Sequence, residues 1–321
     1  VIAVPSGDAR LFREISHLGL EARLDVAVLP PVEESLAGED GIVSVADVRP
    51  LSVRDLLGRP QVETDIDQIA GYITNRRVLV TGAGGSIGSE LCRQLHRLGP
   101  AELVRLDRDE SALHAVQLQL EGRALLSSRN LVVADIRDRE RMHEVFAEHR
   151  PHVVFHAAAL KHLPLLEMHP GEGMKTNGFG TQILLEMAAE FDIDRFVNVS
   201  TDKAADPSSV LGQTKRMAER LTAHYAQHTP GTFLSVRFGN VLGSRGSVLE
   251  TFTAQIEAGG PVTVVHPDIT RYFMVAEEAV ELVIQAGAIG RDGEALVLDM
   301  GEPVKIDEVA RQLIAHADRP I

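Results

Sequence analysis

Tryptophan is absent from the 321-residue sequence, and aromatic residues make up only 4% of it. Base-stacking platforms and aromatic sugar cages are built from such rings, so their scarcity argues against both. A single cysteine, Cys92, cannot form a disulfide within the chain, and no cysteine and histidine cluster has zinc-binding spacing. The sequence therefore predicts a protein of a reducing compartment whose recognition of ligands is polar and led by the backbone.

Basic residues are in the minority, with 32 lysines and arginines against 46 aspartates and glutamates, which gives a net charge of -14. No basic run interleaved with aromatic residues occurs, so nucleic acid is not expected as a partner. No apolar run approaches the roughly 18 to 20 residues of a transmembrane helix, and no signal peptide stands at the start. This stretch is therefore expected to be soluble, with no direct membrane contact. Its 44% of hydrophobic residues suffice for a packed core.

Short runs rich in β-branched residues recur from Arg76 onward, and each precedes an amphipathic, helix-like stretch. Alternation of apolar strands with helices is typical of a parallel sheet covered on both faces. We therefore predict a doubly wound α/β domain of the Rossmann type over 76–321, with a small substrate lobe contributed mainly by 240–321. Residues 1–75 are expected to form a partial N-terminal α/β segment and a linker. The predicted strands are Val78–Thr81, Leu103–Leu106, Leu131–Ala134, Val153–His156, Phe196–Ser200 and Phe233–Arg237.

A glycine-rich turn follows the first of these strands, with Gly82, Gly85 and Gly88 in a G-x-x-G-x-x-G pattern. Backbone amides at the start of the following helix can bind a pyrophosphate, because glycine lets the ligand approach and the helix dipole favours anions. Asp107 ends the next predicted strand, and its carboxylate suits the ribose hydroxyls of NAD. Arg108 beside it could accept the 2′-phosphate of NADP, so NADP stays an alternative to NAD.

Lysine is rare, because only five of the 32 basic residues are lysines, and four of the five fall between residues 161 and 215. In a chain that prefers arginine, lysines indicate positions that need a compact charge or a group able to lose its proton. One of them, Lys203, follows Thr201 and Asp202 at the end of the fifth predicted strand. A carboxyl group beside an amine can protonate a leaving group and remove a carbon-bound proton, provided that their environment moves the two pKa values apart. The alternative is that Thr201, Asp202 and Lys203 form a solvated turn without a catalytic role.

These features resemble the extended short-chain dehydrogenase/reductase superfamily, in which a Tyr-x-x-x-Lys pair follows the fifth strand. Lys215 occupies the lysine position, but Leu211 stands where the tyrosine is expected. Six blocks in order, covering about Leu56–Ala315, further resemble the nucleotide-sugar 4,6-dehydratases of polysaccharide biosynthesis, typified by membrane-anchored UDP-N-acetylglucosamine 4,6-dehydratases. In that family the tyrosine position is commonly aliphatic, so Leu211 is consistent with activity. The blocks are Thr81–Leu91, His156–His162, Ser200–Ala204, Gly212–Arg216, Val236–Ser247 and His266–Met274.

The resemblance implies an internal redox cycle on UDP-N-acetylglucosamine or a similar nucleotide hexose. C4 would give hydride to bound NAD, water would leave across C5 and C6, and the hydride would return to C6, which gives a 4-keto-6-deoxy sugar nucleotide. By similarity, Asp202 protonates the departing C6 hydroxyl, Lys203 removes the C5 proton and Thr201 hydrogen-bonds the C4 oxygen. Lys215 is expected to hold the nicotinamide ribose. The acceptor of the C4 hydroxyl proton stays open, with water as one candidate.

The same resemblance assigns a wider set of residues. The expected cofactor-binding residues are Gly82, Gly85, Ser86, Ile87, Gly88, Asp107, Arg108, Asp135, Ile136, Ala157, Ala158, Ala159 and Lys215. The residues expected to meet the substrate or support its site are Lys161, Asn177, Asn240, Arg245, Ser247 and Arg271. Arg245 and Arg271 suit a diphosphate by charge and geometry, with surface ion pairs as the alternative. No metal site is expected, since His224 and His228 lie four residues apart without an evident third ligand.

Members of this family usually carry transmembrane helices and another α/β domain before the catalytic part, and a further stretch after it that helps bind uridine diphosphate. The resemblance therefore implies an inner-membrane parent protein with this portion on the cytoplasmic face, and it suggests a homo-oligomer. Two other functions stay open, namely a nucleotide-sugar epimerase, which expels no water, and a catalytically silent NAD-binding module. Thr201, Asp202 and Lys203 favour the dehydratase, whereas Leu211 is the best support for the silent module.

Overall fold

A computed structural model gives the fold of the chain and describes residues 14–15, 18–19, 22, 24, 26–29, 48–50, 69–123, 126–244, 246–315 and 317. The chain divides into two compact units. The larger unit comprises Glu63–Arg245 and Ala276–Met300, and the smaller comprises Val1–Val62, Gly246–Val275 and Gly301–Ile321. Among the residues so described, no helix is both long enough and apolar enough to cross a membrane.

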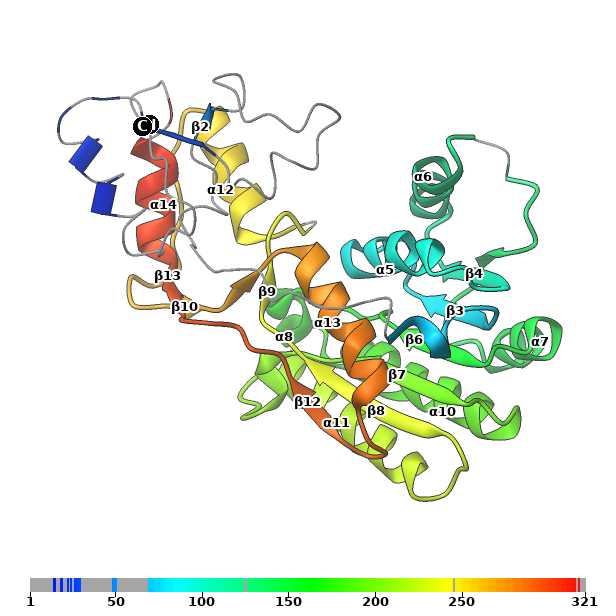
Figure 1. The fold of residues 1–321 in the computed structure, drawn as a ribbon. Coiled ribbons are helices and arrows are strands. Elements are labelled where there is room, and N and C mark those ends of the chain that lie inside the picture. Colours follow the sequence, from blue (N-terminus) through cyan, green and yellow to red (C-terminus); the bar gives the residue numbers. More distant parts are fainter. Residues whose placement is uncertain are drawn as a thin grey trace. The chain divides into compact units, whose positions relative to one another are not determined.

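A seven-stranded sheet forms the centre of the larger unit (Figure 1). Its strand order is β12-β8-β7-β6-β3-β4-β5, and all neighbouring strands are parallel. The chain builds the sheet outward from β3 in one direction and then from β6 in the other, which is the doubly wound Rossmann arrangement. The predicted fold class is confirmed. The strands are β3 (Arg77–Thr81), β4 (Glu102–Asp107), β5 (Leu131–Val133), β6 (Val153–His156), β7 (Arg195–Val199), β8 (Thr232–Arg237) and β12 (Ala295–Val297).

Helices cover both faces of this sheet (Figure 1), which is why apolar residues predominate in its strands on both faces. Side chains alternate along a strand, so Leu79 joins the core on one face while Val78 and Val80 are buried on the other. The helices on the first face are α7 (Arg139–His149), α10 (Thr181–Glu190) and α11 (Val210–Ala226). Those on the second face are α5 (Ser86–Arg97), α6 (Glu110–Glu121) and α13 (Ala276–Ile289).

Local sequence fixes where several of these helices begin and end. Asp109 and Asp138 precede α6 and α7, and each carboxylate accepts a hydrogen bond from an amide of the first turn. Ser209 caps α11 in the same way through the amide of Gly212. Gly122 ends α6 in the left-handed conformation that glycine adopts without steric cost. Of these caps, Ser209 fixes the residue at which α11 begins.

Shorter elements connect the strands of the larger unit. They are η2 (Ala70–Tyr72), α8 (Leu163–Met168), α9 (Pro170–Gly173), the π-helix η3 (Met174–Gly180), η4 (Asp202–Ala204) and β9 (Asn240–Val241). The elements described in the smaller unit are β1 (Ala27–Val28), β2 (Arg49–Pro50), α12 (Val248–Glu257), β10 (Thr270–Arg271), β11 (Phe273–Met274), β13 (Val304–Lys305) and α14 (Ile306–Ala315). Strands β1 and β2 pair antiparallel, as do β10 and β13, and α12 packs on α14.

The two units divide the C-terminal part of the chain unevenly. Residues 276–300, which include α13 and β12, belong to the larger unit, whereas 246–275 and 301–321 belong to the smaller one. Most of 1–75 lies outside the described residues. The substrate lobe over 240–321 and the N-terminal α/β segment therefore stay predictions.

Candidate cofactor-binding and active site

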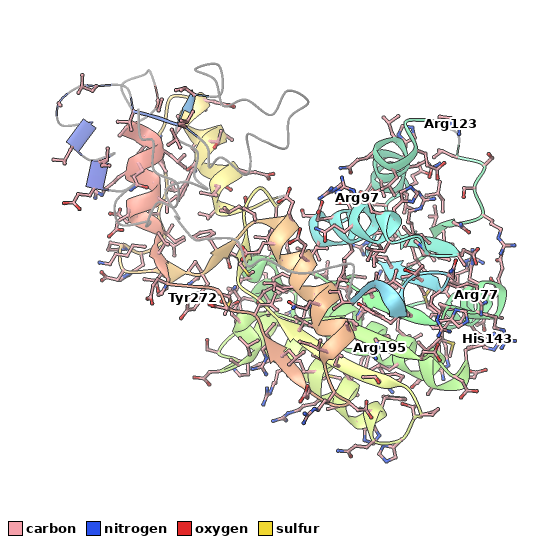
Figure 2. All side chains as sticks on the ribbon, in the orientation of Figure 1. Arg77, Arg97, Arg123, His143, Arg195 and Tyr272 are labelled. Atoms are coloured by element: carbon pink, nitrogen blue, oxygen red, sulfur yellow. The ribbon has the colours of Figure 1, made fainter. Side chains whose placement is uncertain are left out.

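The candidate residues of the larger unit follow the carboxyl ends of its parallel strands. Strand β3 leads into Gly82, β6 into Ala157 and β7 into Ser200. Open α/β sheets bind ligands at this edge, next to the point where the strand order reverses, which here lies between β3 and β6. Figure 2 shows Arg77 and Arg195 at the opposite edge, where β3 and β7 begin.

The turn between β3 and α5 has space only for glycine at its two ends. Gly82 has φ +70°, and a Cβ atom there would lie 2.6 Å from the backbone nitrogen of Ala158. A Cβ atom at Gly88 would overlap the carbonyl oxygen of Gly82. Gly85 precedes the first turn of α5, which begins with Ser86 and Ile87, so the positive end of that helix dipole faces the turn. This geometry fits a pyrophosphate lying against the backbone.

Asp107 ties the end of β4 to the glycine turn. Its Oδ2 accepts a hydrogen bond from the amide of Gly84 at 2.8 Å, and its Oδ1 accepts one from the amide of Asp109 at 3.0 Å. A carboxylate has about four acceptor positions, so both oxygens can still accept from ribose hydroxyls. Arg108 follows as an exposed side chain. The structure therefore places Asp107 beside the glycine turn, and the cofactor-binding roles of Asp107 and Arg108 stay predictions.

Asp135 and Ile136 follow β5 at the same edge of the sheet. Arg137 donates to Asp135, with Nη2 2.6 Å from Oδ2, and these hydrogen bonds hold the pKa of the Asp135 carboxyl below its usual range. Ile136 is buried, and a Cβ atom at Gly180 would come within 2.8 Å of its Cδ1. Ala157, Ala158 and Ala159, which follow β6, are half-buried. This part of the larger unit therefore presents the ionised carboxylate of Asp135 and the small side chains of Ala157, Ala158 and Ala159.

Thr201, Asp202 and Lys203 form one hydrogen-bonded cluster at the end of β7. The hydroxyl of Thr201 donates to Asp202 Oδ1 at 2.8 Å, and Lys203 Nζ donates to the same oxygen at 2.9 Å. Lys203 Nζ also donates to Asn240 Oδ1 at 3.0 Å. The Asp202 amide donates to the carbonyl oxygen of Phe238, so the segment is attached to the chain that follows β8. The three residues predicted from the loop therefore meet, and Asn240 joins them.

Lys215 and Leu211 lie one turn apart on α11, and both are buried, at 7% and 5% exposure. The ammonium group of Lys215 donates to the carbonyl oxygen of Val199 at 2.9 Å. Val199 lies two residues before the Thr201–Lys203 cluster, hereafter the acid–base cluster. Burial lowers the pKa of Lys215 to about 8, and the negative charge of Glu219 opposes this shift. The structure thus places Lys215 at the end of β7, with Leu211 buried one turn earlier, and the roles that the resemblance gives them stay predictions.

A buried polar row crosses the sheet beneath α10 and α11. Thr81, His156, Asn198 and Ser235 occupy the same register on four neighbouring strands. Thr181 Oγ1 donates to the Asn177 carbonyl oxygen, so it must accept from His156 Nε2 at 2.9 Å, which leaves Nδ1 to accept from Thr81. Burial lowers the pKa of His156 to about 3, so the ring is neutral. This row fixes the end of β3 against the helices, and we had not predicted it.

Asn177 supports the site from the π-helix η3. Its Nδ2 donates to the carbonyl oxygen of Leu160 and to Thr214 Oγ1, while its Oδ1 accepts from the Leu160 amide. At 1% exposure, its amide therefore joins the loop after β6 to α11. Lys161, in the same loop, is exposed. The structure thus favours support over direct substrate contact for Asn177.

The remaining expected substrate residues belong to the smaller unit or lie outside the described residues. Ser247 and Arg271 belong to the smaller unit, where Ser247 caps α12 and Arg271 Nη1 donates to the carbonyl oxygen of Thr270 at 2.8 Å. Arg245 lies outside the described residues. The assignment of these three residues to the substrate stays a prediction.

A buried carboxylate, Glu219, is a further part of the site that the sequence analysis missed. Its Oε1 accepts from Ser200 Oγ at 2.6 Å and from Arg237 Nε at 2.7 Å. Its Oε2 accepts from Arg237 Nη2 at 2.6 Å and from Arg216 Nη1 at 3.2 Å. The available signal was the spacing, because Glu219 lies four residues after Lys215 on one face of a predicted helix.

The family model described as "Polysaccharide biosynthesis protein" matches residues 78–320. The chain belongs to this family. Membership in the polysaccharide biosynthesis protein family confirms the resemblance drawn from the six sequence blocks. The match includes the glycine turn, the acid–base cluster and α11 of the larger unit.

Individual proteins of known name are similar over most of the chain. The capsular polysaccharide biosynthesis protein CapD of Staphylococcus aureus is 44% identical over 98% of this chain and 52% of its own length. The chain thus spans about half the length of that relative. A UDP-glucose 4-epimerase of Rickettsia prowazekii is 32% identical over 70% of this chain and 66% of its own length.

The fold is shared with DesIV, a dTDP-glucose 4,6-dehydratase of Streptomyces venezuelae whose structure was solved with NAD bound. The TM-score is 0.66 at 22% identity, over 74% of this chain and 80% of DesIV. An identity this low supports the fold and no more.

Proposed function

We propose that this chain carries the catalytic part of a nucleotide-sugar 4,6-dehydratase that acts on UDP-N-acetylglucosamine or a similar nucleotide hexose. The observation that carries the proposal is the cluster of Thr201, Asp202 and Lys203, in which an acid and a base share one hydrogen bond. It lies at the ligand-binding edge of a sheet that also presents the glycine turn. We also propose NAD as the cofactor and membrane anchoring and self-association of the whole protein.

The residues at the glycine turn fit a dinucleotide. Gly82 and Gly88 leave no space for a side chain, so a pyrophosphate can approach the backbone at the start of α5. Asp107 would bind the adenosine ribose, and its charge disfavours the 2′-phosphate of NADP. Bound NAD would supply a hydride acceptor for the sugar C4 and a donor for C6. DesIV was solved with NAD bound, so a chain of this fold can hold the dinucleotide.

The acid–base pair can reach its reactive state by moving one proton. As an ion pair, Asp202 and Lys203 hold a carboxylate and an ammonium group whose atoms lie 2.9 Å apart. Transfer of a proton from Lys203 Nζ to Asp202 Oδ1 would leave a neutral amine and a carboxylic acid without exchange with solvent. The amine could then remove the C5 proton while the acid protonates the departing C6 hydroxyl. Loss of water would thus return the pair to a carboxylate and an ammonium group. Lys203 could then give a proton back to C5, and one proton from solvent, equal to the one that the C4 hydroxyl loses to water, would restore the ammonium group.

Neighbouring groups would hold the sugar and the amine in place. The hydroxyl of Thr201 directs its proton at Asp202, and its oxygen accepts from the Lys203 amide at 3.5 Å, so one lone pair remains to accept a hydrogen bond from the C4 hydroxyl. Asn240 fixes the amine of Lys203 from the other side. A protonated Lys215 would favour the departure of the C4 hydroxyl proton through its charge, and that proton would pass to water.

A nucleotide-sugar epimerase is the second candidate, favoured by the likeness to the Rickettsia prowazekii enzyme. An epimerase would use the same cofactor site but would need no acid to expel a C6 hydroxyl. The direct pairing of Asp202 with Lys203 therefore favours the dehydratase. The two functions differ in product mass, which makes them simple to separate.

The test is incubation of the protein with NAD and UDP-N-acetylglucosamine in heavy water, followed by mass spectrometry and proton NMR. We expect loss of one water and incorporation of deuterium at C5 of a 4-keto-6-deoxy product. Lys203→Gln and Asp202→Asn should each lower kcat by roughly 10²- to 10⁴-fold, the range of general acid–base catalysis. Lys175→Gln is the matched control, since Lys175 is an exposed lysine of the same unit that pairs with Glu172.

An unchanged sugar mass with inverted configuration would establish the epimerase instead. Full turnover by Lys203→Gln would show that the base has been wrongly assigned. Absence of product from the wild-type chain and from the longer protein, across several nucleotide hexoses, would contradict the dehydratase.

A further inference from the structure

Glu219 contacts neighbouring side chains of the site rather than a ligand. Its carboxylate is 4% exposed and accepts hydrogen bonds from Ser200, Arg216 and Arg237. With four donors around its two oxygens, it has no acceptor position directed at a sugar or a dinucleotide. Any effect of Glu219 on the reaction must therefore pass through its neighbours.

These neighbours hold the acid–base segment on both sides. Ser200, which donates to Glu219, comes immediately before Thr201. Arg237 precedes Phe238, whose carbonyl oxygen accepts from the Asp202 amide at 3.0 Å. The carboxylate thus joins the end of β7 to the end of β8 through α11. Loss of this connection would leave the segment that carries Asp202 and Lys203 with fewer restraints, chiefly its backbone hydrogen bonds to Val236 and Phe238.

The same carboxylate lies one helical turn after Lys215, and side chains at this spacing are neighbours. Other charged or titratable groups lie on α11 itself and on the elements packed against it. Arg216 and Arg237 pair with Glu219, the buried His156 is neutral, and Asp202 pairs with Lys203 on η4. Of these charges, that of Glu219 raises the pKa of Lys215 against the effect of burial. Without it, the buried amine would lose its proton more easily.

We propose that Glu219 is a positioning residue with two effects: it fixes the Thr201–Lys203 segment through Ser200 and Arg237, and it keeps Lys215 protonated at neutral pH. The first effect rests on the proposed function, because its consequence is a rate. The second concerns a charge state and can be measured without any turnover.

The charge effect is testable because the chain has only five lysines. Selective ¹³Cε labelling of lysine should give five resolvable signals, and the signal lost in Lys215→Met identifies Lys215. We expect the Lys215 titration midpoint to move to lower pH by roughly half a unit or more in Glu219→Gln. Glu90→Gln is the matched control, because Glu90 is a buried glutamate of α5 that pairs with Arg93. An equal midpoint in wild type and Glu219→Gln would overturn the charge effect.

Ser200→Ala separates the two effects, since it removes the contact to the acid–base segment and keeps the charge of Glu219. We expect its Lys215 midpoint to equal that of wild type, while kcat falls about 10-fold or more with KM changed less than about 3-fold. A wild-type kcat in Ser200→Ala would overturn the positioning effect. If the wild-type chain forms no product, the proposed function fails while the NMR titration still decides the charge effect.

Should Glu219→Gln fail to fold, as judged by circular dichroism, Glu219→Asp replaces it. Aspartate keeps the charge but has a shorter reach to Ser200. We expect a Lys215 midpoint near that of wild type together with a reduced kcat. A Lys215 midpoint clearly below that of wild type would contradict the charge effect. An unchanged kcat would contradict the positioning effect.

Discussion

A positive charge at Lys215 is costly because the side chain is buried between α11 and the sheet. Its pKa is lowered from 10.5 to about 8, a difference that corresponds to about 3 kcal/mol between the two protonation states. The hydrogen bond to the Val199 carbonyl oxygen returns about 1 kcal/mol of this cost. Lys215 therefore lowers the free energy of unfolding at neutral pH, although its charge is part of the proposed site.

Lys215→Met should accordingly stabilise the protein at pH 7 by about 1 to 2 kcal/mol and abolish turnover. Between pH 8 and 10.5 the unfolded chain binds more protons at this position than the folded chain, so the wild type gains stability as the pH rises. The gain of about 3 kcal/mol exceeds the gap at pH 7, so the wild type should become the more stable protein by pH 10.5. Urea unfolding at pH 7 and at pH 10.5 measures this change, with the exposed Lys175→Met as control. A variant less stable than wild type at pH 7 would contradict this account.

Single residues also show how far sequence can predict the site. The glycine turn and the Thr201–Lys203 cluster were predictable because their members are close in sequence and their chemistry is local. His156 and Glu219 were not, because apart from Arg216, which is three residues from Glu219, their side-chain partners lie 18 to 75 positions away. Their roles depend on strand register and on the face that α11 turns to the sheet. Only the folded chain brings those groups together.

At the scale of elements, α11 carries the site because it packs closely against η4. Gly212, in the first turn of α11, permits this approach, since a Cβ atom there would overlap the carbonyl oxygen of Lys203 and lie 3.2 Å from Pro207 Cα. The obstacle is backbone on both sides, so it cannot move as a flexible side chain could. Glycine at this position sets how near the helix and the acid–base segment can come.

Gly212→Ala should displace η4 from α11 and lower kcat by at least about 10-fold, with a loss of stability of about 1 to 3 kcal/mol from overpacking. Gly171→Ala in α9 is the matched control, because a Cβ atom there meets nothing within 4 Å. That control should keep full activity and wild-type or slightly higher stability. Turnover and urea unfolding of both variants measure the difference. Equal kcat values for the two variants would show that the close packing does not position the segment.

Strand elements were easier to predict than the last part of the sheet. The six predicted strands agree with β3 to β8 within one residue at each end, because each is a short run in which apolar and β-branched residues predominate. Strand β12 was missed, since three residues, Ala295–Val297, are too few to show a period. It forms by parallel pairing with β8 at the edge of the sheet, which no local pattern indicates.

At the scale of the whole molecule, the chain has a net charge of -14 yet is proposed to bind two anionic ligands. Local groups must therefore outweigh the overall repulsion. At the ligand-binding edge these groups are backbone amides, the start of α5, and the ammonium groups of Lys203 and Lys215. Binding at this edge would connect β3, β4 and β6, so it should stabilise the seven-stranded unit as a whole.

We therefore expect NAD at about 100 times its Kd to stabilise the protein by about 2.7 kcal/mol, because it binds the folded state alone. Asp107→Ala loses both the proposed ribose acceptor and the hydrogen bond to Gly84, so at the same NAD concentration the gain should fall to about 1.4 kcal/mol or less. Asp138→Ala is the control, since Asp138 caps α7 and should lower stability without changing the gain from NAD. Urea unfolding with and without NAD measures all three proteins. An equal gain in Asp107→Ala and wild type would place the adenosine ribose elsewhere, and no gain in any of them would argue against a dinucleotide at this edge.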